Sequence, residues 1–162
     1  MSEESKSISK VDLKRLDLAE VVMKDPVIAA APIVKLLGRA PFSQSRLRRF
    51  SDKAVLMQQH DPGDSLFLVM AGEVRLLARK DKDTAELGTV HRGEVLGEGE
   101  AMHGGNRRCS AVAQGQVDVV EIPRSALLQG GALSPAMSKL LADVHAQRTK
   151  ALDEMHDFLN RW

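Results

Sequence analysis

Residues 97–112, which read GEGEAMHGGNRRCSAV, combine the side chains best suited to bind a small polar ligand. Glu98 offers a carboxylate that accepts hydrogen bonds from hydroxyl groups, and the adjacent Arg107 and Arg108 offer guanidinium groups that bind anions through paired contacts. The glycine at position 97 lets the backbone come close to a ligand, and N–H groups at the start of a short helix near residues 99–101 would face an anion. The stretch therefore predicts a site for a ligand that carries a negative charge and a free hydroxyl group.

Three other ligand-binding motifs do not fit the sequence. A Walker A phosphate loop needs a lysine at the position where Gly105 stands. The dinucleotide fingerprint G-x-G-x-x-G begins at Gly97 but reaches Met102 where its third glycine belongs. A calcium-binding loop at residues 81–88 would need a glycine in place of Glu86.

No residues are spaced as a catalytic or metal-binding group. We find no Ser-His-Asp or Cys-His arrangement in the sequence. His145 and His156 lie on one face of a predicted helix, but at ~1.5 Å per residue they are about 16 Å apart, too far to share a metal ion. The histidines are therefore assigned to the surface, and we expect a protein that is not an enzyme and that holds neither a metal nor a cofactor. They are His60, His91, His103, His145 and His156.

The composition is that of a folded protein without a strong field of one sign. The 162 residues carry a formal net charge of +1 with 28% charged residues, and 43% hydrophobic residues are enough for one core. One cysteine cannot form an intramolecular disulfide, and no run approaches 18 apolar residues. The N-terminal MSEESKSISK lacks the apolar stretch of a secretory signal. These observations predict a cytoplasmic protein with no membrane segment.

Two helical stretches are expected before the first strands. Residues 1–7 are polar and are predicted to be mobile. Apolar residues recur at helical spacing over residues 8–23, and Pro26 is expected to end or kink that helix. A second stretch, residues 27–37, contains a proline inside it and is expected to form two short helices or one broken helix. Residues 8–42 are therefore predicted to form an N-terminal helical segment.

Short β-branched and aliphatic segments, separated by turn residues, predict antiparallel β structure in the middle of the chain. The arginine-rich residues 46–49 are instead expected to be a solvated helix end, because they lack the interleaved aromatic residues and the helix-turn-helix of a DNA-binding segment. The expected strands are residues 54–57, 66–71, 74–78, 85–90, 95–96, 111–113 and 117–122, with turns that include 71–73 and 114–116. Many short strands with terminal helices favour a barrel or sandwich with helical additions.

A long helix is predicted at residues 135–162, with Ser134 as its N-cap and Pro135 in its first turn. Its apolar side chains alternate at spacings of four and three residues, interrupted by Arg148. This stripe fits either a core within one chain or the seam of a homodimer, and both remain open. Its members are Met137, Leu141, Val144, Ala151, Met155, Phe158 and Trp162.

Several stretches, in order, resemble the cyclic-nucleotide-binding domain, the β-roll module of the catabolite-activator family, of protein kinase regulatory subunits and of nucleotide-gated channels. DPGDSLFLVMAGEVRLL at residues 61–77 is similar to the paired strands of the family, and LGTVHRGEVLGE at 87–98 to the strands that lead into its phosphate-binding cassette. Residues 97–113 are similar to the cassette itself, and EIPRSALLQGGALSPAMSKLL at 121–141 to the trailing apolar helix. The resemblance covers residues 42–150.

The resemblance implies a mainly β fold with added helices. It places an antiparallel β-roll, of the double-stranded β-helix or jelly-roll type, at residues 43–132. The N-terminal helices precede this roll in the sequence. Residues 133–162 follow as a C-terminal helix that serves as a lid or a dimerisation element.

The resemblance also implies a set of ligand-binding residues. Arg108 is preferred over Arg107 as the phosphate ligand, because adjacent strand residues face opposite sides and Arg108 lies eleven residues after Gly97 and four before Val112. Cys109 follows that arginine at a position where a hydroxyl is associated in the family with guanine, which favours adenine. The predicted set is Leu96, Gly97, Glu98, Gly99, Glu100, Arg108 and Cys109 from the cassette, with Arg148 and Leu152 from the lid helix.

These residues together predict a stand-alone sensor of a cyclic mononucleotide, cAMP ahead of cGMP, that couples ligand binding to movement of the C-terminal helix. Glu98 would accept a hydrogen bond from the ribose 2′-OH. The alternative is a degenerate β-roll that no longer binds nucleotide and acts as a protein-interaction adaptor. We expect a possible homodimer and an unidentified downstream protein as partners, but no DNA and no membrane.

Overall fold

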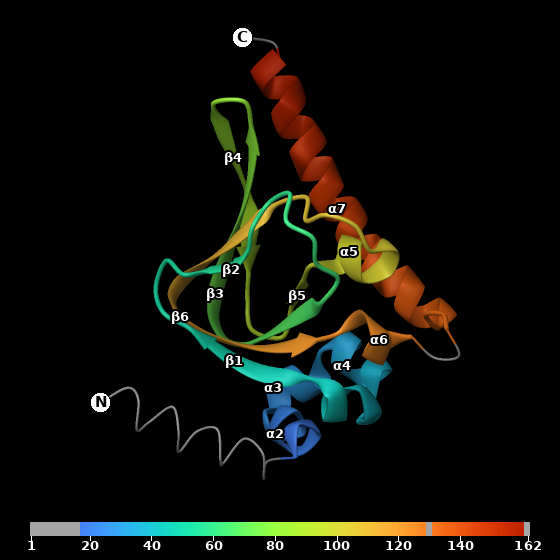
Figure 1. Cartoon of the computed structure of the whole chain (residues 1–162). Coiled ribbons are helices and arrows are strands. Elements are labelled where there is room, and N and C mark those ends of the chain that lie inside the picture. The colour runs from blue at the N-terminus through green and yellow to red at the C-terminus, as the bar shows by residue number, and fades with distance from the viewer. Residues whose placement is uncertain (1–16, 129–130, 161–162) are drawn as a thin grey trace.

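The computed structural model describes residues 17–128 and 131–160, without the side chains of residues 152 and 155–160. Within these residues the N-terminal part contains helices Leu18–Lys24 (α2), Pro26–Ala30 (α3) and Pro32–Leu37 (α4) and the 3-10 helix Ala40–Gln44 (η1). The strands are Arg46–Phe50 (β1), Val55–Met57 (β2), Leu66–Lys80 (β3), Asp83–Val90 (β4), Val95–Leu96 (β5) and Ser110–Ile122 (β6). The later helices are Glu98–His103 (α5), Arg124–Leu127 (α6) and Pro135–Asn160 (α7). The predicted antiparallel β-roll between N-terminal helices and a long C-terminal helix is confirmed (Figure 1).

The N-terminal helices are short because a capping aspartate or a proline starts each of them. Asp17 accepts a hydrogen bond from the backbone N–H of Glu20 at the start of α2, and Asp25 accepts from the N–H groups of Val27 and Ile28 at the start of α3. Pro26 and Pro32 stand in the first turns of α3 and α4, where a missing N–H is harmless. Of the two alternatives for residues 27–37, two short helices are confirmed, since Pro32 begins a new helix. The mobile segment predicted at residues 1–7 and most of the first predicted helix lie outside the described residues.

Two long antiparallel strands, β3 and β6, form the centre of the sheet. The strand order is β1-β6-β3-β4, with β2 paired to β6 and β5 paired to β3. Each long strand joins two segments that the sequence predicts as separate strands, and the turns predicted at residues 71–73 and 114–116 are irregularities within continuous strands. At Gly72 the backbone has φ of +87°, and a Cβ atom there would lie 2.3 Å from the carbonyl oxygen of Gln116. Glycine is needed at this crossing because the two backbones approach too closely for a side chain.

Strand β1 corrects the expectation that residues 46–49 end a helix. The strand pairs antiparallel with β6, and its arginines meet acids across the ladder: Arg46 and Arg48 both contact Glu121 at 2.9 Å. Arg49 contacts Asp118 at 2.8 Å. Burial alone would raise the pKa of the Glu121 carboxyl, but hydrogen bonds from Arg46, Ser65 and Arg48 outweigh that effect and lower this pKa. Cross-strand charge pairing therefore explains why so basic a stretch forms a strand.

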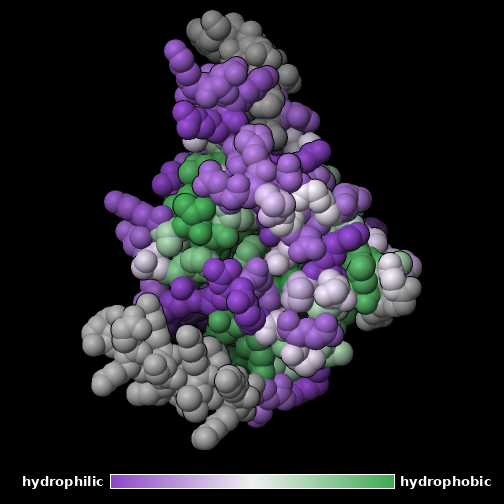
Figure 2. Space-filling model, in the orientation of Figure 1, coloured by the Kyte–Doolittle hydropathy of each residue, from purple (hydrophilic) through white to green (hydrophobic). Residues whose placement is uncertain are grey.

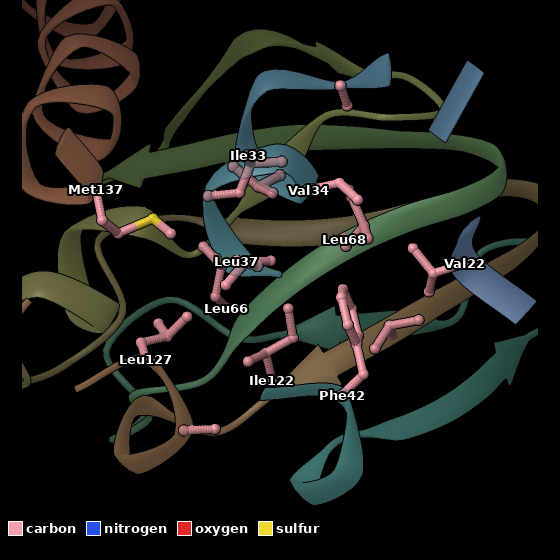
Figure 3. Packing of buried hydrophobic residues seen from close by; sticks show 14 of the residues in the cluster. Val22, Ile33, Val34, Leu37, Phe42, Leu66, Leu68, Ile122, Leu127 and Met137 are labelled. Atoms are coloured by element: carbon pink, nitrogen blue, oxygen red, sulfur yellow. The ribbon is translucent and has the colours of Figure 1, made fainter. Parts of the chain in front are cut away.

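Two apolar clusters hold the roll and its helices together. The first lies between the N-terminal helices, the outer face of the long strands and the start of α7, where Phe42, Leu68 and Ile122 are almost fully buried (Figure 3). The second fills the interior of the roll. Val95 belongs to the first cluster and Leu96 to the second, so the two sides of β5 are anchored in different cores. The segment that follows β5 is thereby held at a defined position between them.

Helix α7 begins on the core and then extends beyond the roll (Figure 1). The predicted cap is present, because the Ser134 hydroxyl accepts a hydrogen bond from the N–H of Met137. Met137 and Leu141 are buried in the first cluster, so this part of the predicted stripe is core within the chain. The later stripe members Met155, Phe158 and Trp162 lie outside the described side chains.

The exterior of the roll is largely polar. Hydrophilic side chains gather near the upper end of the face shown in Figure 2, around the tip of the β3–β4 hairpin. In residues 17–128 and 131–160, no helix is long and apolar enough to cross a membrane.

Candidate functional site

The cassette between β5 and β6 begins with a strained turn. Gly97 has a left-handed φ of +82°, and a Cβ atom at this position would lie 2.8 Å from both the carbonyl oxygen of Ser65 and Nη1 of Arg107. Any other residue would therefore disturb both the backbone and the neighbouring guanidinium. The turn directs the chain into α5, where Glu98 and Glu100 are 6% and 5% exposed. Two carboxylates are thus buried in the first turn of α5, directly after β5.

Arg107 is a buried cation at the centre of the cassette, 5% exposed. Its Nη1 donates to Oε1 of Glu100 at 3.1 Å, and its Nη2 donates to the carbonyl oxygen of Ser65 at 3.0 Å. The guanidinium carbon lies 5.6 Å from the centroid of the Phe67 ring, within the range of a cation–π contact. Hydrogen bonds of the Arg107 backbone to residues 60 and 61, both 2.8 Å, fix the direction of the side chain.

Glu98 points from the first turn of α5 towards α7. Its carboxylate accepts a hydrogen bond from Nη1 of Arg148, and Nδ1 of His145 lies 3.3 Å from its second oxygen. Nη2 of Arg148 also donates to the carbonyl oxygen of Val95 at 2.6 Å. His145 packs so closely over α5 that a Cβ atom at Gly99 would lie 2.9 Å from its Cε1. The long helix is therefore tied to the cassette through buried polar contacts.

These groups surround a small cavity inside the roll, of about 40 Å³. Its walls include Leu76, Glu98, Cys109, Arg148 and Thr149. The volume is far below the ~300 Å³ at which small-molecule pockets begin, so a nucleotide would enter only if these groups moved apart. Burial, and then the nearby carboxylates of the cassette, raise the pKa of the Cys109 thiol to about 12, which keeps it neutral at physiological pH.

A larger cleft of about 1050 Å³ lies beside the cassette, between α5, α6 and α7. Arg124 lies along it and donates to the carbonyl oxygens of Ala101 and Met102 near the end of α5. Glu98, Glu100 and Cys109 line the small cavity and not this cleft, so we place the candidate site in the small cavity despite its size. Among the described residues, no three His, Cys, Asp or Glu side chains are grouped to hold a metal ion.

The sequence profile described as "Cyclic nucleotide-binding domain" matches residues 47–130. This stretch is 84 of the 162 residues and contains the cassette, Arg107 and the long strands. The chain belongs to the cyclic nucleotide-binding domain family. No curated protein sequence matches it significantly.

Solved structures support the fold of this family member. The regulatory domain of protein kinase A from Toxoplasma gondii, in complex with cAMP, superposes with a TM-score of 0.68 at 16% identity, covering 80% of this chain and 50% of its own. The catabolite activator protein of Thermus thermophilus gives 0.60 at 23% identity, covering 83% and 63%. The regulatory subunit of a cAMP-independent protein kinase A from Trypanosoma cruzi, bound to guanosine, gives 0.66 at 16% identity, covering 87% and 50%. This chain thus spans between half and less than two thirds of the length of these three proteins, one of which is cAMP-independent.

Most of the predicted site residues lie together in the structure. The stretch from Leu96 to Glu100 forms the cassette turn and the first part of α5, and all of these residues are buried. Cys109 lines the cavity, and Arg148 contacts Glu98 as a lid residue should. The side chain of Leu152 lies outside the described residues. Whether any of these residues binds a ligand stays a prediction.

The two adjacent arginines have different surroundings. Arg107 is buried against Glu100 and Phe67, whereas Arg108 is exposed and lines both the small cavity and the larger cleft. Arg107 instead lines a separate cavity of about 420 Å³ beside residues 61–65. The burial of Arg107 was not expected from the sequence. Which of the two arginines binds a phosphate stays a prediction.

Two further residues of the site escaped the sequence analysis. His145 was assigned to the surface, although it contacts Glu98 across the cavity. Thr149 brings a hydroxyl from α7 to the cavity wall. Both lie on the helix face that also carries Arg148, and spacing within the helix could have grouped them. Nothing in the sequence showed that this face lies over α5.

Proposed function

We propose that the chain is a sensor of a cyclic mononucleotide, with cAMP ahead of cGMP, and that ligand binding moves α7 relative to the cassette. The observation that carries the proposal is the contact of Glu98 with Arg148 and His145, because it joins the ribose-binding candidate directly to the long helix. A ribose 2′-OH that donates to Glu98 would compete with both of these lid residues. Occupancy of the site would thereby change the position of α7, which is the requirement for a signal.

The small cavity supports a response that includes opening. A ligand of nucleotide size needs several times the present cavity volume of 40 Å³. The side chains that line the cavity and would have to move include those of α7. Separation of α7 from α5 would release the ion pair at Glu98 and open the cavity. The lid would then close on the bound ligand in a new position, with Thr149 available to the base.

The preference for cAMP rests on the missing hydroxyl near the arginine. Neither the residue after Arg108, which is Cys109, nor the residue after Arg107, which is Arg108, offers the hydroxyl that the family associates with guanine. The next hydroxyl, on Ser110, already accepts a hydrogen bond from the N–H of Gln59.

The role that we propose is regulatory rather than catalytic, with a protein of unidentified nature downstream. The later part of the apolar stripe on α7 is proposed to form a homodimer. The single cysteine, which can form no disulfide within the chain, favours the cytoplasm.

The test is direct titration of the full chain with cAMP and cGMP, followed by calorimetry and by thermal unfolding. A ligand present at 100 times its Kd adds ~2.7 kcal/mol to the free energy of unfolding. We expect a clear rise in the melting temperature with cAMP, a smaller one with cGMP, and loss of both in Glu98→Ala. The exposed substitution Glu86→Ala on β4, whose side chain pairs with Arg75 and does not line the cavity, is the matched control and should leave binding unchanged. Absence of heat and of any melting shift with either nucleotide would reject the proposal.

One observation favours a second candidate, the adaptor that binds no nucleotide. Both buried carboxylates of the cassette already have positively charged partners on the same chain, so the folded site is electrostatically complete. The same titration separates the two functions, because an adaptor would show no nucleotide response while remaining folded.

A further inference from the structure

Glu100, the buried partner of Arg107, has no role in the sensor mechanism described above. We propose that Glu100 is an internal competitor for the anionic group of the ligand: its carboxylate occupies the side of Arg107 that a phosphodiester would use. The inference rests on the proposed function, with Arg107 as the residue that binds the phosphate. It makes Glu100 a specificity-determining residue of this chain.

Glu100 stands between the small cavity and the guanidinium of Arg107, because Glu100 lines that cavity and Arg107 does not. Nη2 is taken by the carbonyl oxygen of Ser65 at 3.0 Å, and the ring of Phe67 lies over the group. Nε lies against Gly63, so closely that a Cβ atom there would be 2.7 Å away. The remaining nitrogen, Nη1, donates to Glu100 at 3.1 Å. A phosphate oxygen that reaches Arg107 from the small cavity therefore has to replace the Glu100 carboxylate.

The charge balance of the cassette leads to the same conclusion. Glu98 and Glu100 provide two buried carboxylates, and Arg107 and Arg148 provide two cations that pair with them. A phosphodiester would add a third negative charge, and the remaining arginine on the cavity wall, Arg108, is exposed to solvent and offsets that charge only weakly. An uncharged riboside adds no such charge, because it makes the ribose contact to Glu98 and leaves Glu100 on Arg107. Glu100 should therefore weaken binding of cyclic nucleotides without weakening binding of the corresponding nucleoside.

The experiment compares the full-length wild type with Glu100→Gln and Glu100→Ala. Glutamine keeps the shape and a hydrogen-bond acceptor while removing the charge, and alanine removes the side chain, so one variant remains informative if the other does not fold. Glu86→Gln makes the same chemical change at an exposed ion pair on β4 and serves as the control. The ligands are cAMP and adenosine in calorimetry, and inorganic phosphate in thermal unfolding.

We expect cAMP to bind Glu100→Gln at least about ten-fold more tightly than the wild type, a change that corresponds to ~1.4 kcal/mol. Adenosine should bind both proteins alike. Inorganic phosphate should raise the melting temperature of Glu100→Gln but not that of the wild type, and the added substitution Arg107→Ala should abolish this effect.

The outcomes separate the inference from the proposed function. Equal cAMP affinity in the wild type and in both Glu100 variants, with no stabilisation by phosphate, overturns the inference while leaving the sensor function in place. Phosphate stabilisation confined to the Glu100 variants, without binding of any cyclic nucleotide, supports the inference and rejects the sensor. A folded Glu100→Gln protein that responds to neither phosphate nor cAMP overturns both.

Discussion

Replacement of Arg107 by alanine is the perturbation that tests the geometry of the cassette most directly. The structure predicts a large loss of stability for Arg107→Ala and almost none for Arg108→Ala, although the two residues are adjacent and chemically identical. The difference in stability between the two variants therefore measures the effect of burial and ion pairing, because the residue type removed is the same.

The magnitude follows from what the Arg107 side chain contacts. Its removal leaves the carboxylate of Glu100, 7% exposed, without a cation and the carbonyl oxygen of Ser65 without its donor, and it uncovers one side of the Phe67 ring. Breaking a buried pair by removing one partner costs about 3–5 kcal/mol. For a chain of this size that corresponds to a fall in melting temperature of roughly 6–20 °C. Arg108→Ala, at an exposed position, should stay within ~0.5 kcal/mol of the wild type.

The assay is equilibrium unfolding in urea, followed by circular dichroism, on both single variants and on the double variant Arg107→Met with Glu100→Leu. Because the double variant leaves no buried charge unpaired, it should recover much of the stability that Arg107→Ala loses. Equal effects of the substitutions at 107 and 108 would refute the assigned direction of the two side chains. A double variant as unstable as the sum of its single changes would refute the paired-charge account.

Three other measurements test separate parts of the structure. Because hydrogen bonds from arginines lower the folded-state pKa of Glu121, its contribution to stability is present above the ordinary carboxyl pKa of 4.5 and lost as pH falls through the lower folded value. Glu121→Gln should therefore flatten the stability profile below pH 4.5, and parallel profiles would contradict this. With a pKa raised to about 12, the Cys109 thiol should react with a disulfide reagent at pH 8 about three orders of magnitude more slowly in the folded than in the unfolded chain. Similar rates would show that the thiol is not buried beside the cassette. Light scattering should give about twice 17.7 kDa, and Met155→Glu with Phe158→Glu should return a folded monomer; a monomeric wild type would exclude the α7 seam.

The sequence by itself determined the elements whose signals are local. Ser134 and Pro135 mark the start of α7, and the apolar run at residues 95–96 followed by Gly97 marks β5 and the cassette turn. Spacing between these features was enough to indicate the family, because capping, turn formation and strand alternation depend on residues a few positions apart.

The tertiary structure decided which partners the charged residues find. Residues 46–49 form a strand only because β6 presents Glu121 and Asp118 opposite their arginines, about 70 positions later in the chain. Two strands predicted apart became the single β3 because β6 pairs with it continuously past the predicted turn, over residues 66–77.

The same holds inside the cassette. The Arg107–Glu100 pair depends on the path of the chain as it enters β6, and the Arg148–Glu98 pair depends on the packing of α7 over α5. The local sequence around the arginines indicates neither. A guanidinium has the same intrinsic preferences at 107 and 108, and the difference arises only when folding removes one of them from water. Burial of a charge requires an opposite charge nearby, and the fold alone brings that charge into position.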